Sequence, residues 1–471
     1  MAGHTPFVIE IPWREPVDAF RALGGEDWLV FLDSARPDAE IGRYAFLAAD
    51  PFEKLVVKDG ATYRNGEPVP GNFFDILKDD LYSYACETIV GIPPFQGGAA
   101  GYFGYELGTL LERVPRAGID DMGVPDAAIG LYDLVLAFDL ETQCAFLIST
   151  GVPAEGVGRD MRARQRAALL LEKLDRAPIE MAAGHGGDAV HWRSNFSPEA
   201  YRAAVARVID YIYAGDIFQA NLTQRFLGKL DVGNNPTNLH MALRRRNPAP
   251  FAACLKAGNT TVLSTSPERF LALSGDKVET RPIKGTRRRT TDEGADAAIR
   301  EELLASEKDR AENIMIVDLL RNDLSRVCRP GSVKVEESCA LKSYETVHHL
   351  VSTVTGRLEA GRDAVDLLKA AFPGGSITGA PKIRAMEIIA ELEPVVRGPY
   401  CGAIGYIGFD GAMDTNIVIR TMVLKDGKVA VQAGGGIVAD SDPAAEYQES
   451  LDKAAALLEP FGTIERAEAA E

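Results

Sequence analysis

Short apolar runs separated by turn residues dominate the first 150 residues of the chain. Typical runs are "DWLVFLDSARP" at 27–37, "GGAAGYFGYELG" at 97–108 and "AAIGLYDLVLAFDLETQCAFLIS" at 127–149. Runs of this kind, bounded by glycine, proline or aspartate, are typical of strands and hairpins. The pattern predicts a first half built mainly of strands, with a few helices between them.

Residues 159–176 change to a helical spacing. The predicted apolar side of this helix holds Leu169, Leu170, Leu171 and Leu174. The polar segment 182–195, "AAGHGGDAVHWRSN", is the best linker candidate. Amphipathic helices, glycine turns and strands alternate after it, and Ser197 followed by Pro198 forms a good N-cap and first-turn pair. We therefore predict an N-terminal half at 1–180 and a C-terminal region at 195–465, joined in one body.

Composition narrows the class of protein. The chain has 471 residues, 46% hydrophobic and 25% charged, and a formal net charge of −17, which disfavours general binding to nucleic acids or anionic membranes. The six cysteines are far apart and form no CxxC pair, so reduced thiols are expected instead of disulfides or a zinc site. The N-terminal sequence lacks the apolar core of a signal peptide, and no apolar run is long enough to span a membrane. These features predict a cytoplasmic protein.

The segment "ETRPIKGTRRR" at 279–289 carries a lysine in an unusual setting. The pattern predicts a strand that ends near Ile283 and enters a turn, with Pro282 stiffening the approach and Gly285 releasing it. Lys284 would then be a reactive buried amine or a surface lysine in a basic run. The sequence pattern leaves both readings open.

Two predicted helices each carry a pair of carboxylates three residues apart. Asp309 and Glu312 lie in "SEKDRAENIMIVDLL", and Glu446 and Glu449 lie in "DSDPAAEYQESLDKAAALL", where Asp442 and Pro443 are expected to start the helix. An i, i+3 spacing places both acids of a pair on one helix face. Together they would suit octahedral Mg²⁺, although an acidic pair taken alone is more often a solvated helix face in a chain this acidic.

Other segments could bind an anion or transfer a proton. Three glycines, Gly434, Gly435 and Gly436, follow an apolar strand and are predicted to form either a carboxylate nest or a merely tight turn. The segment 372–389 brings a Gly/Ser/Thr loop to a helix that is expected to begin near Pro381. Arg420 is predicted on the strand "NIVIRT", where it would clamp a carboxylate or form an ordinary ion pair. One of the two adjacent histidines at 348–349 could act as an acid or base.

Taken together, these segments resemble the chorismate-utilising enzyme family, which includes anthranilate synthase component I, aminodeoxychorismate synthase component I, and the isochorismate and salicylate synthases. The resemblance covers roughly 195–460 in an ordered series of motifs. The series comprises "GDIFQANLTQRF", "STSPERF", "RPIKGTRRR", "AENIMIVDLLRNDL", "VHHLVS", "GGSITGAPKIRAMEII", "GAIGYIGFDG", "NIVIRT" and "QAGGGIVADSDPAAEYQES". It implies an α+β fold of two large, mainly antiparallel β-sheets packed together with helices outside.

Within this family, "PIKGT" is similar to the aminodeoxychorismate synthases, whereas anthranilate synthases typically have alanine in place of the lysine. The resemblance implies that Lys284 attacks C2 of chorismate as the 4-hydroxyl leaves, and that ammonia then enters at C4 to give 4-amino-4-deoxychorismate. Glu268 matches the family's general acid and lies on a segment that a hairpin could return to Lys284. Burial beside Arg281 and Arg287 is expected to lower the pKa of the lysine, as a nucleophilic amine requires.

The remaining roles follow from the resemblance, residue by residue. Glu312 and Glu449 match the ligands of Mg²⁺, with Glu446 and Asp309 in support. His349 matches an active-site histidine. The implied substrate-binding groups are Thr378, Tyr400, Arg420, Gly434, Gly435, Gly436 and Gln219. At Gln219, the isochorismate and salicylate synthases have a lysine that activates water, so ammonia is the nucleophile expected here.

The resemblance also implies partners and a second ligand. Ammonia would come from a separate glutamine amidotransferase subunit, since no nucleophilic cysteine in a glycine-rich setting is present. Some family members bind tryptophan in the N-terminal half, which makes Asp33, Ser34 and Tyr44 a candidate tryptophan site. Three alternatives stay open: anthranilate synthase component I, an enzyme that serves both pathways, and a catalytically inactive regulatory or binding subunit.

Overall fold

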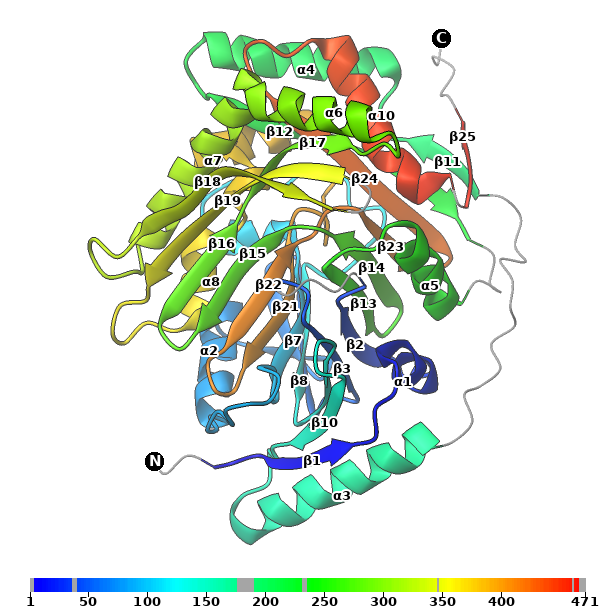
Figure 1. Ribbon diagram of the computed structural model, residues 1–471, viewed down its shortest axis with the longest axis vertical. Helices are drawn as coiled ribbons and strands as arrows, with labels where there is room; N and C mark the ends of the chain where they lie inside the picture. Colours follow the sequence, from blue (N-terminus) through cyan, green and yellow to red (C-terminus); the bar gives the residue numbers. More distant parts are fainter. Residues whose placement is uncertain are drawn as a thin grey trace.

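The computed structural model describes residues 4–35, 40–175, 190–230, 235–344, 347–459 and 461–465. Within these residues, 13 strands form the first of two large sheets (Figure 1). In spatial order its strands are β1 (Phe7–Ile11), β10 (Cys144–Ser149), β9 (Leu134–Asp139), β3 (Tyr44–Ala49), β2 (Trp28–Asp33), β13 (Phe251–Ala257), β14 (Thr260–Ser266), β23 (Thr421–Lys425), β24 (Lys428–Ile437), β12 (Gln219–Lys229), β11 (Val190–Ser194) and β25 (Gly462–Glu465), with the short β20 (Gly379–Ala380) beside β12. All its pairings are antiparallel except that of β11 with β25.

The second sheet has 12 strands in the described part of the chain, and every pairing in it is antiparallel. On one edge of β19 (Val347–Arg357) lies β18 (Lys334–Ser343), and on its other edge β16 (Lys277–Arg281) and β17 (Ile283–Arg288) pair one after the other. From β16 the order continues through β15 (Arg269–Ser274), β22 (Met413–Ile417), β21 (Ala403–Gly408), β7 (Gly98–Phe103), β8 (Ala127–Tyr132), β4 (Glu53–Lys58), β5 (Ala61–Arg64) and β6 (Glu67–Val69).

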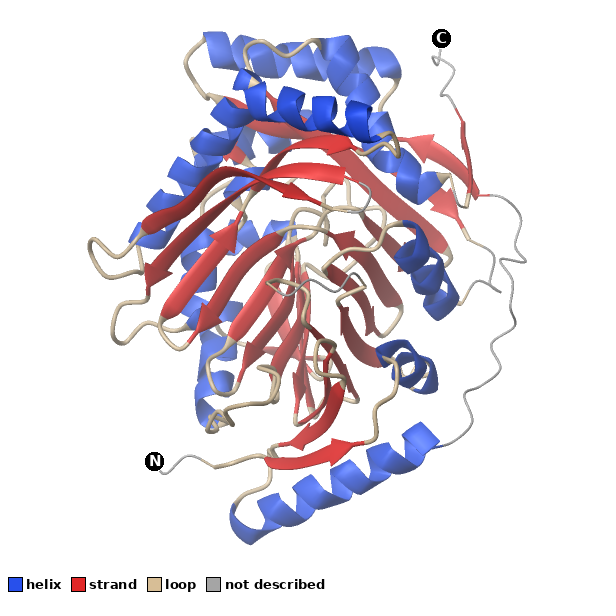
Figure 2. Ribbon diagram, viewed as in Figure 1, coloured by secondary structure: helices blue, strands red, loops and turns tan. Residues whose placement is uncertain are grey.

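Helices cover the outer faces of the two sheets (Figure 2). They are α1 (Pro16–Ala22), α2 (Phe73–Ser83), α3 (Gly156–Asp175), α4 (Pro198–Tyr213), α5 (Pro236–Arg246), α6 (Glu293–Ala305), α7 (Glu307–Ser325), α8 (Ala364–Ala371), α9 (Lys382–Leu392) and α10 (Pro443–Leu458), with 3₁₀ turns at Tyr105–Leu110 and Gly375–Ile377. The predicted α+β fold of two packed antiparallel sheets is confirmed.

Burial on both faces explains why so many strands are continuously apolar. In β2, Leu29 and Phe31 face the helix-covered core, while Val30 belongs to the layer between the sheets. In β7, Phe103 faces the helices of the second sheet and Tyr102 faces the layer between the sheets. The strict alternation of a half-exposed strand is therefore absent from these central strands.

Strands from both predicted halves are mixed in both sheets. The N-terminal β2 pairs with β13, and β7 pairs with β21 from the C-terminal region. The division at 1–180 and 195–465 stays a prediction about sequence organisation. In the described residues, no helix is long and apolar enough to cross a membrane.

Local predictions fare differently along the chain. Helix α3 forms as predicted and buries Leu170 and Leu174, but Leu169 is 50% exposed, because it falls on the outer side of the helix. The linker candidate is wrong over Val190–Ser194, which forms β11, while the rest of it up to residue 189 lies outside the described residues.

Candidate functional site

Lys284 lies on a strand and not in a turn, which corrects the sequence prediction. Strands β16 and β17 follow one another along the same edge of β19, and Pro282 separates them because it has no N–H to donate. Gly285 has φ +78° and marks a bulge in the pairing between Lys284 and Thr286. A Cβ at Gly285 would lie 3.0 Å from Cβ of Asp309 on α7, so this glycine allows helix α7 to pack closely beside the lysine.

The three glycines also belong to a strand, so the predicted turn is wrong. Gly434, Gly435 and Gly436 continue β24 and pair with Thr223, Leu222 and Asn221 of β12. A Cβ added at Gly436 would lie 2.0 Å from Nε2 of Gln219 and 3.4 Å from Nζ of Lys284. Glycine at this position therefore lets side chains from both sheets meet over β24.

Glu268 lies beside Lys284 through the predicted hairpin. Strands β15 and β16 return the chain so that Arg269 pairs with Arg281, and the Ile283 backbone and the Ser376 hydroxyl lie close enough to the Glu268 carboxylate to lower its pKa. Burial raises the pKa of Glu268 to about 7, against the opposing effects of Ser376 and Lys284. The side chain is 5% exposed, and a carboxyl of this kind can hold a proton near neutral pH.

Burial acts on Lys284 in the opposite sense. It lowers the pKa of the half-buried ammonium, the Lys453 charge lowers it further, and Glu312, Glu268 and Glu449 raise it. The expected neighbours do not have this role: Arg281 pairs with Glu279 and Glu40, and Arg287 pairs with Glu302 and Asp309. The predicted direction of the shift is therefore correct, but its cationic source is Lys453.

Arg420 is placed in a bend and not on the predicted strand. It follows β22 of the second sheet and precedes β23 of the first, with φ +50°. Burial lowers the pKa of its guanidinium, and Glu268 raises it. The side chain thus sits near Glu268 at a point where the chain crosses from one sheet to the other.

The four predicted acids approach one another from α7 and α10. A Cβ at Gly435 would lie 3.1 Å from Oε2 of Glu446 and 3.5 Å from Oε1 of Glu449. Burial raises the pKa of Glu312 and of Glu446; the Asp309 and Glu446 charges raise that of Glu312 further, and the Glu449 charge raises that of Glu446. For Glu449, burial opposes ionisation, but the Lys453 ammonium 2.6 Å away lowers the pKa overall.

These acids fit a divalent cation in their chemistry, since all their donors are carboxylate oxygens. In the described residues no three His, Cys, Asp or Glu side chains are gathered tightly enough to hold a metal ion, and basic side chains pair with the acids. Lys453 pairs with Glu449, Lys308 lies 3.8 Å from Glu446, and Arg287 pairs with Asp309. Both lysines are about half exposed and can turn towards solvent.

The other predicted site residues are buried on different elements. His349 is buried on β19, and its Nδ1 lies 2.8 Å from the Thr286 hydroxyl on β17. Thr378 is fully buried in the loop before α9 and donates its hydroxyl proton to the Gly374 carbonyl. Tyr400 belongs to the apolar core cluster, and among the described residues no hydrogen bond or ion pair joins it to Lys284.

Sequence reasoning did not single out Lys453 and Ser376. Lys453 donates to Glu449 and to the Gly434 carbonyl, and its charge acts on Lys284. Its i, i+4 spacing from Glu449 was a usable signal, because such residues share a helix face. Ser376 lies within the quoted "GGSITG" segment, but only its contact with Glu268 reveals a role.

Comparison with known proteins matches residues 31–459 to the family model described as chorismate binding enzyme. The chain belongs to the chorismate binding enzyme family. An aminodeoxychorismate synthase component 1 from Salmonella typhimurium is 41% identical over 97% of the chain and 98% of the relative. An anthranilate synthase component 1 from Streptomyces coelicolor is 42% identical over 97% of the chain and 87% of the relative. Relatives with either of the two names are thus about equally similar to this chain in sequence.

Solved structures give the same fold. Anthranilate synthase component I from Streptococcus pneumoniae superposes with a TM-score of 0.80 at 33% identity, over 90% of this chain and 93% of that one. The menaquinone-specific isochorismate synthase from Escherichia coli shares the fold at 18% identity, with a TM-score of 0.72 over 97% and 96% of the two chains.

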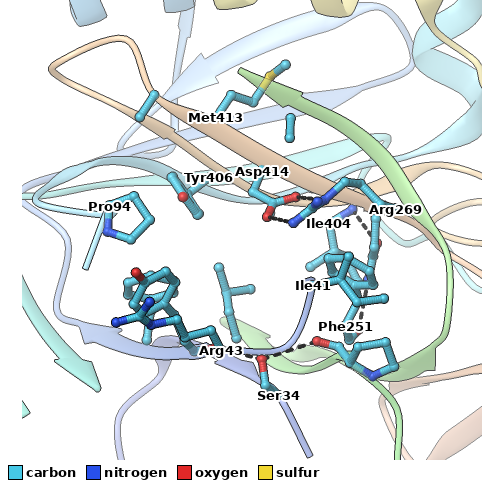
Figure 3. Close-up of a pocket in the computed structure, with 18 of the residues that line it drawn as sticks. Ser34, Ile41, Arg43, Pro94, Phe251, Arg269, Ile404, Tyr406, Met413 and Asp414 are labelled. Carbon is cyan, nitrogen blue, oxygen red and sulfur yellow. Dashed lines mark hydrogen bonds and ion pairs between the residues drawn. The ribbon is translucent and has the colours of Figure 1, made fainter. Parts of the chain in front are cut away.

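A second feature of this chorismate binding enzyme is a cavity of about 530 Å³ that is lined by residues of both sheets (Figure 3). The three tryptophan-site candidates, Asp33, Ser34 and Tyr44, all line it. Asp33 is paired with Arg244, and Ser34 donates to the Tyr44 carbonyl, so both also have structural partners. Figure 3 shows the Arg269–Asp414 ion pair on one wall, with Arg43 on another.

Proposed function

We propose that this chain aminates chorismate at C4, giving 4-amino-4-deoxychorismate, as the synthase component of a glutamine-dependent enzyme. One observation carries the proposal: a half-buried lysine with a lowered pKa faces a buried carboxyl whose pKa is raised to about 7. An amine nucleophile needs to be neutral, and a hydroxyl leaving group needs a proton, so the two shifts suit the two roles.

The proposed reaction starts with attack of the Lys284 Nζ lone pair on C2. The ring double bonds shift, the C4–O bond breaks, and Glu268 gives its proton to the hydroxyl, which leaves as water. Ammonia then bonds to C4, the double bonds shift back, and the C2–N bond to Lys284 breaks. The sum is chorismate plus ammonia giving aminodeoxychorismate plus water.

The surrounding residues would bind and orient the substrate. Arg420, near Glu268, would pair with a carboxylate of chorismate, and the backbone of 434–436 and Thr378 would border the enolpyruvyl group. His349, whose Nδ1 faces Thr286, would lie against the ring at β19. Tyr400 is assigned with them by resemblance only, and it is buried in the apolar core.

Gln219 suits ammonia as the nucleophile. It is 1% exposed, and its buried Oε1 has no hydrogen-bond partner among the residues that the structure describes. An unpaired buried acceptor is costly, and ammonia offers N–H donors to such a group. A neutral amide cannot take a proton from water, which disfavours hydroxylation. The ammonia would come from a separate glutaminase, in keeping with the name component 1 of the relatives.

Glu312 and Glu449 would hold Mg²⁺, supported by Glu446 and Asp309. The ion would neutralise the ring carboxylate of chorismate, which otherwise meets several acids at close range. Lys308 and Lys453 neutralise these acids in the structure and would turn away or contact the substrate instead.

Anthranilate formation is the second candidate, because the Streptomyces relative is as similar as the Salmonella one. That reaction aminates C2 and releases pyruvate. Lys284 argues against it, since its amine would occupy the side of C2 that ammonia needs.

The deciding experiment incubates purified protein with chorismate, Mg²⁺ and ammonium chloride at mildly alkaline pH, and separates the products by chromatography. A product that becomes p-aminobenzoate only after addition of aminodeoxychorismate lyase supports the proposal. Anthranilate and pyruvate formed without the lyase support the second candidate. If chorismate is not consumed in the presence of Mg²⁺, the result supports the alternative of a catalytically inactive binding subunit.

Lys284→Ala tests the nucleophile. We expect amination at C4 to fall by at least about 100-fold, because covalent catalysis is lost while the fold is kept. Lys334→Ala is the matched control, since Lys334 is an exposed lysine on β18. An undiminished C4 rate in Lys284→Ala, with the control also active, would refute the assignment.

A further inference from the structure

A buried ion pair, Arg397 with Glu393, contacts the loop 374–378 and β12 and has no part in the proposed chemistry. Arg397 is 2% exposed and follows α9, and Glu393 caps the C-terminus of that helix. Nε and Nη2 of Arg397 donate to the two carboxylate oxygens of Glu393 at 2.8 and 2.7 Å. A buried pair of charges is no evidence for stability, because desolvation offsets most of its attraction. Its remaining contacts indicate what else it does.

The guanidinium of Arg397 binds one carbonyl of the loop 374–378 and one carbonyl of β12. Nη1 donates to the Ile377 carbonyl at 3.0 Å, and Nη2 donates to the Asn221 carbonyl at 2.6 Å. The Asn221 N–H in turn donates to the Thr378 carbonyl at 2.8 Å. Ile377 lies between Thr378 and Ser376, whose hydroxyl lowers the pKa of Glu268. The guanidinium therefore ties the loop 374–378 to β12 two residues from Gln219.

Glu393 extends the same network along β12. Its Oε1 accepts hydrogen bonds from the N–H and the hydroxyl of Thr223, at 2.8 and 2.9 Å. The Arg397 carbonyl accepts a bond from Gln432 on β24, two residues before Gly434. The pair thus contacts both strands and the loop that carry site residues.

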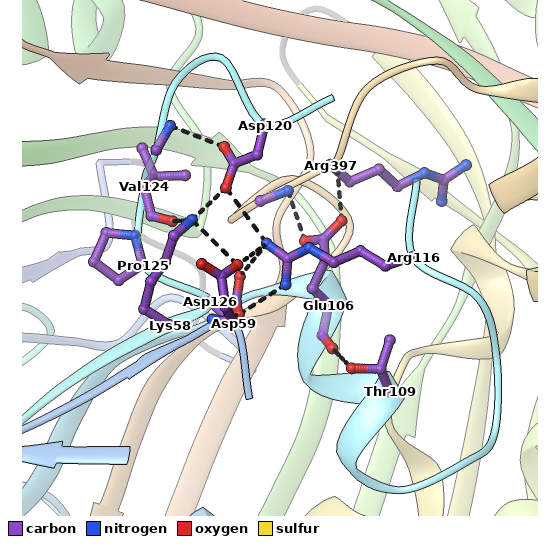
Figure 4. A network of polar contacts seen from close by, with 12 residues as sticks. Lys58, Asp59, Glu106, Thr109, Arg116, Asp120, Val124, Pro125, Asp126 and Arg397 are labelled. Atoms are coloured by element: carbon purple, nitrogen blue, oxygen red, sulfur yellow. Dashed lines mark hydrogen bonds and ion pairs between the residues drawn. The ribbon is translucent and has the colours of Figure 1, made fainter. Parts of the chain in front are cut away.

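Glu106 fixes the backbone of Arg397 from the other side (Figure 4). Its two carboxylate oxygens accept hydrogen bonds from the N–H groups of Arg397 and Gly398, each at 2.8 Å. The Arg397 guanidinium also lies 4.6 Å from the centre of the Tyr105 ring. Backbone and side chain of Arg397 are therefore both held in one position.

We propose that Arg397, together with Glu393, is a positioning residue that sets the loop 374–378 against β12, so that Ser376 reaches the general acid and Thr378 borders the substrate. The expected kinetic effects of this role rest on the proposed function. A lysine cannot replace the arginine, because one ammonium cannot reproduce the planar fork that pairs with Glu393 and holds two further carbonyls.

Arg397→Lys tests the proposal in the amination assay. We expect kcat to fall by about 100-fold with a much smaller change in KM, because a shift of about 1 Å in a catalytic group can cost that much. Combining Arg397→Lys with Ser376→Ala should be non-additive, with the double variant no slower than the slower single variant. If the loss of kcat in the double variant equals the product of the two single losses, Arg397 does not act through Ser376, and the proposal is overturned.

Arg166→Lys is the matched control for loss of a buried arginine–carboxylate pair. Arg166 on α3 donates to Asp133, which is fully buried, and neither residue contacts the site loop. The control should lose thermal stability without losing kcat. Glu393→Gln keeps the shape of the side chain and removes its charge. This milder second variant should also lower kcat, and it replaces Arg397→Lys in the test if Arg397→Lys does not fold.

Amide hydrogen exchange tests the positioning role independently of the reaction. Peptides that cover 219–223 and 374–380 should exchange faster in Arg397→Lys or Glu393→Gln than in the parent and in Arg166→Lys. Unchanged exchange in these peptides would overturn the inference. Failure of the parent protein to consume chorismate would overturn the proposed function instead, and exchange would still decide the role of Arg397.

Discussion

Burial shifts Glu268 and Lys284 in opposite directions because it disfavours the charged form of each. The pKa of Glu268 rises to about 7, and the pKa of Lys284 falls. Each shift brings the group towards the neutral form that its proposed role requires. The pair stays coupled, since the Lys284 charge lowers the pKa of Glu268 and the Glu268 charge raises that of Lys284.

Infrared difference spectra between the parent and Glu268→Gln should show a protonated carboxyl band that fades around pH 7. Ser376→Ala should move this midpoint to higher pH, because the Ser376 hydroxyl favours the ionised carboxylate and lowers its pKa. Burial also raises the pKa of Glu106 to about 7, so its carboxyl band could overlap that of Glu268. The variant Glu106→Gln is the control that identifies the Glu106 band. A midpoint near pH 4.5 for Glu268 would contradict its assignment as the general acid.

At the scale of elements, β24 is a strand in which glycines make room for the site. A Cβ on Gly434 would lie 2.0 Å from the Leu222 carbonyl oxygen, which belongs to the rigid backbone of β12. A Cβ on Gly435 would meet the Glu446 carboxylate at 3.1 Å, and that side chain can move. Neighbouring glycines therefore have different roles, one in strand pairing and one beside the acids.

Gly434→Ala should lower the free energy of unfolding by about 1–3 kcal/mol, the usual cost of overpacking. Gly435→Ala should lose less stability but disturb the binding of Mg²⁺. Thermal unfolding with and without Mg²⁺ separates the two effects. Equal losses of stability in both variants would contradict the prediction that a Cβ which meets the backbone at Gly434 costs more than a Cβ which meets a side chain at Gly435.

At the scale of the whole molecule, residues of both sheets line a cavity, and neither Lys284 nor Glu268 is among its lining residues. Its walls come from β2, β3 and β13 of the first sheet and from β15, β16, β21 and β22 of the second. Arg269, in this wall, directly follows Glu268 and also pairs with Glu279. A ligand in the cavity would therefore contact both sheets beside the general acid.

We expect tryptophan to bind in this cavity at the Asp33, Ser34 and Tyr44 wall. Bound ligand should raise the melting temperature, since binding at 100 times Kd adds about 2.7 kcal/mol to stability. Tyr44→Ala should weaken the binding measured by calorimetry. Tyr63→Ala on β5 is the control outside the cavity. No heat and no thermal shift at millimolar tryptophan would contradict the expectation.

The sequence determined the features that depend on neighbouring residues. Ser197 and Asp442 accept hydrogen bonds from the N–H groups of Ala200 and Ala445, as N-caps do, because capping needs only the local backbone. The short apolar runs gave strands, and the motif series predicted the sheet architecture of the family. The acidic pairs on α7 and α10 followed from helical spacing alone.

Only the tertiary structure decided what happens where distant segments meet. Gly434–Gly436 are a strand because β12 pairs with them, and Arg420 lies in a bend because the chain changes sheets there. The contacts among Gln219, Lys284 and Gly436, and the hold of Arg397 on Ile377 and Asn221, join residues that are far apart along the chain. Local patterns carry no information about such contacts, because the packing of two sheets, and not the spacing of residues, brings them together.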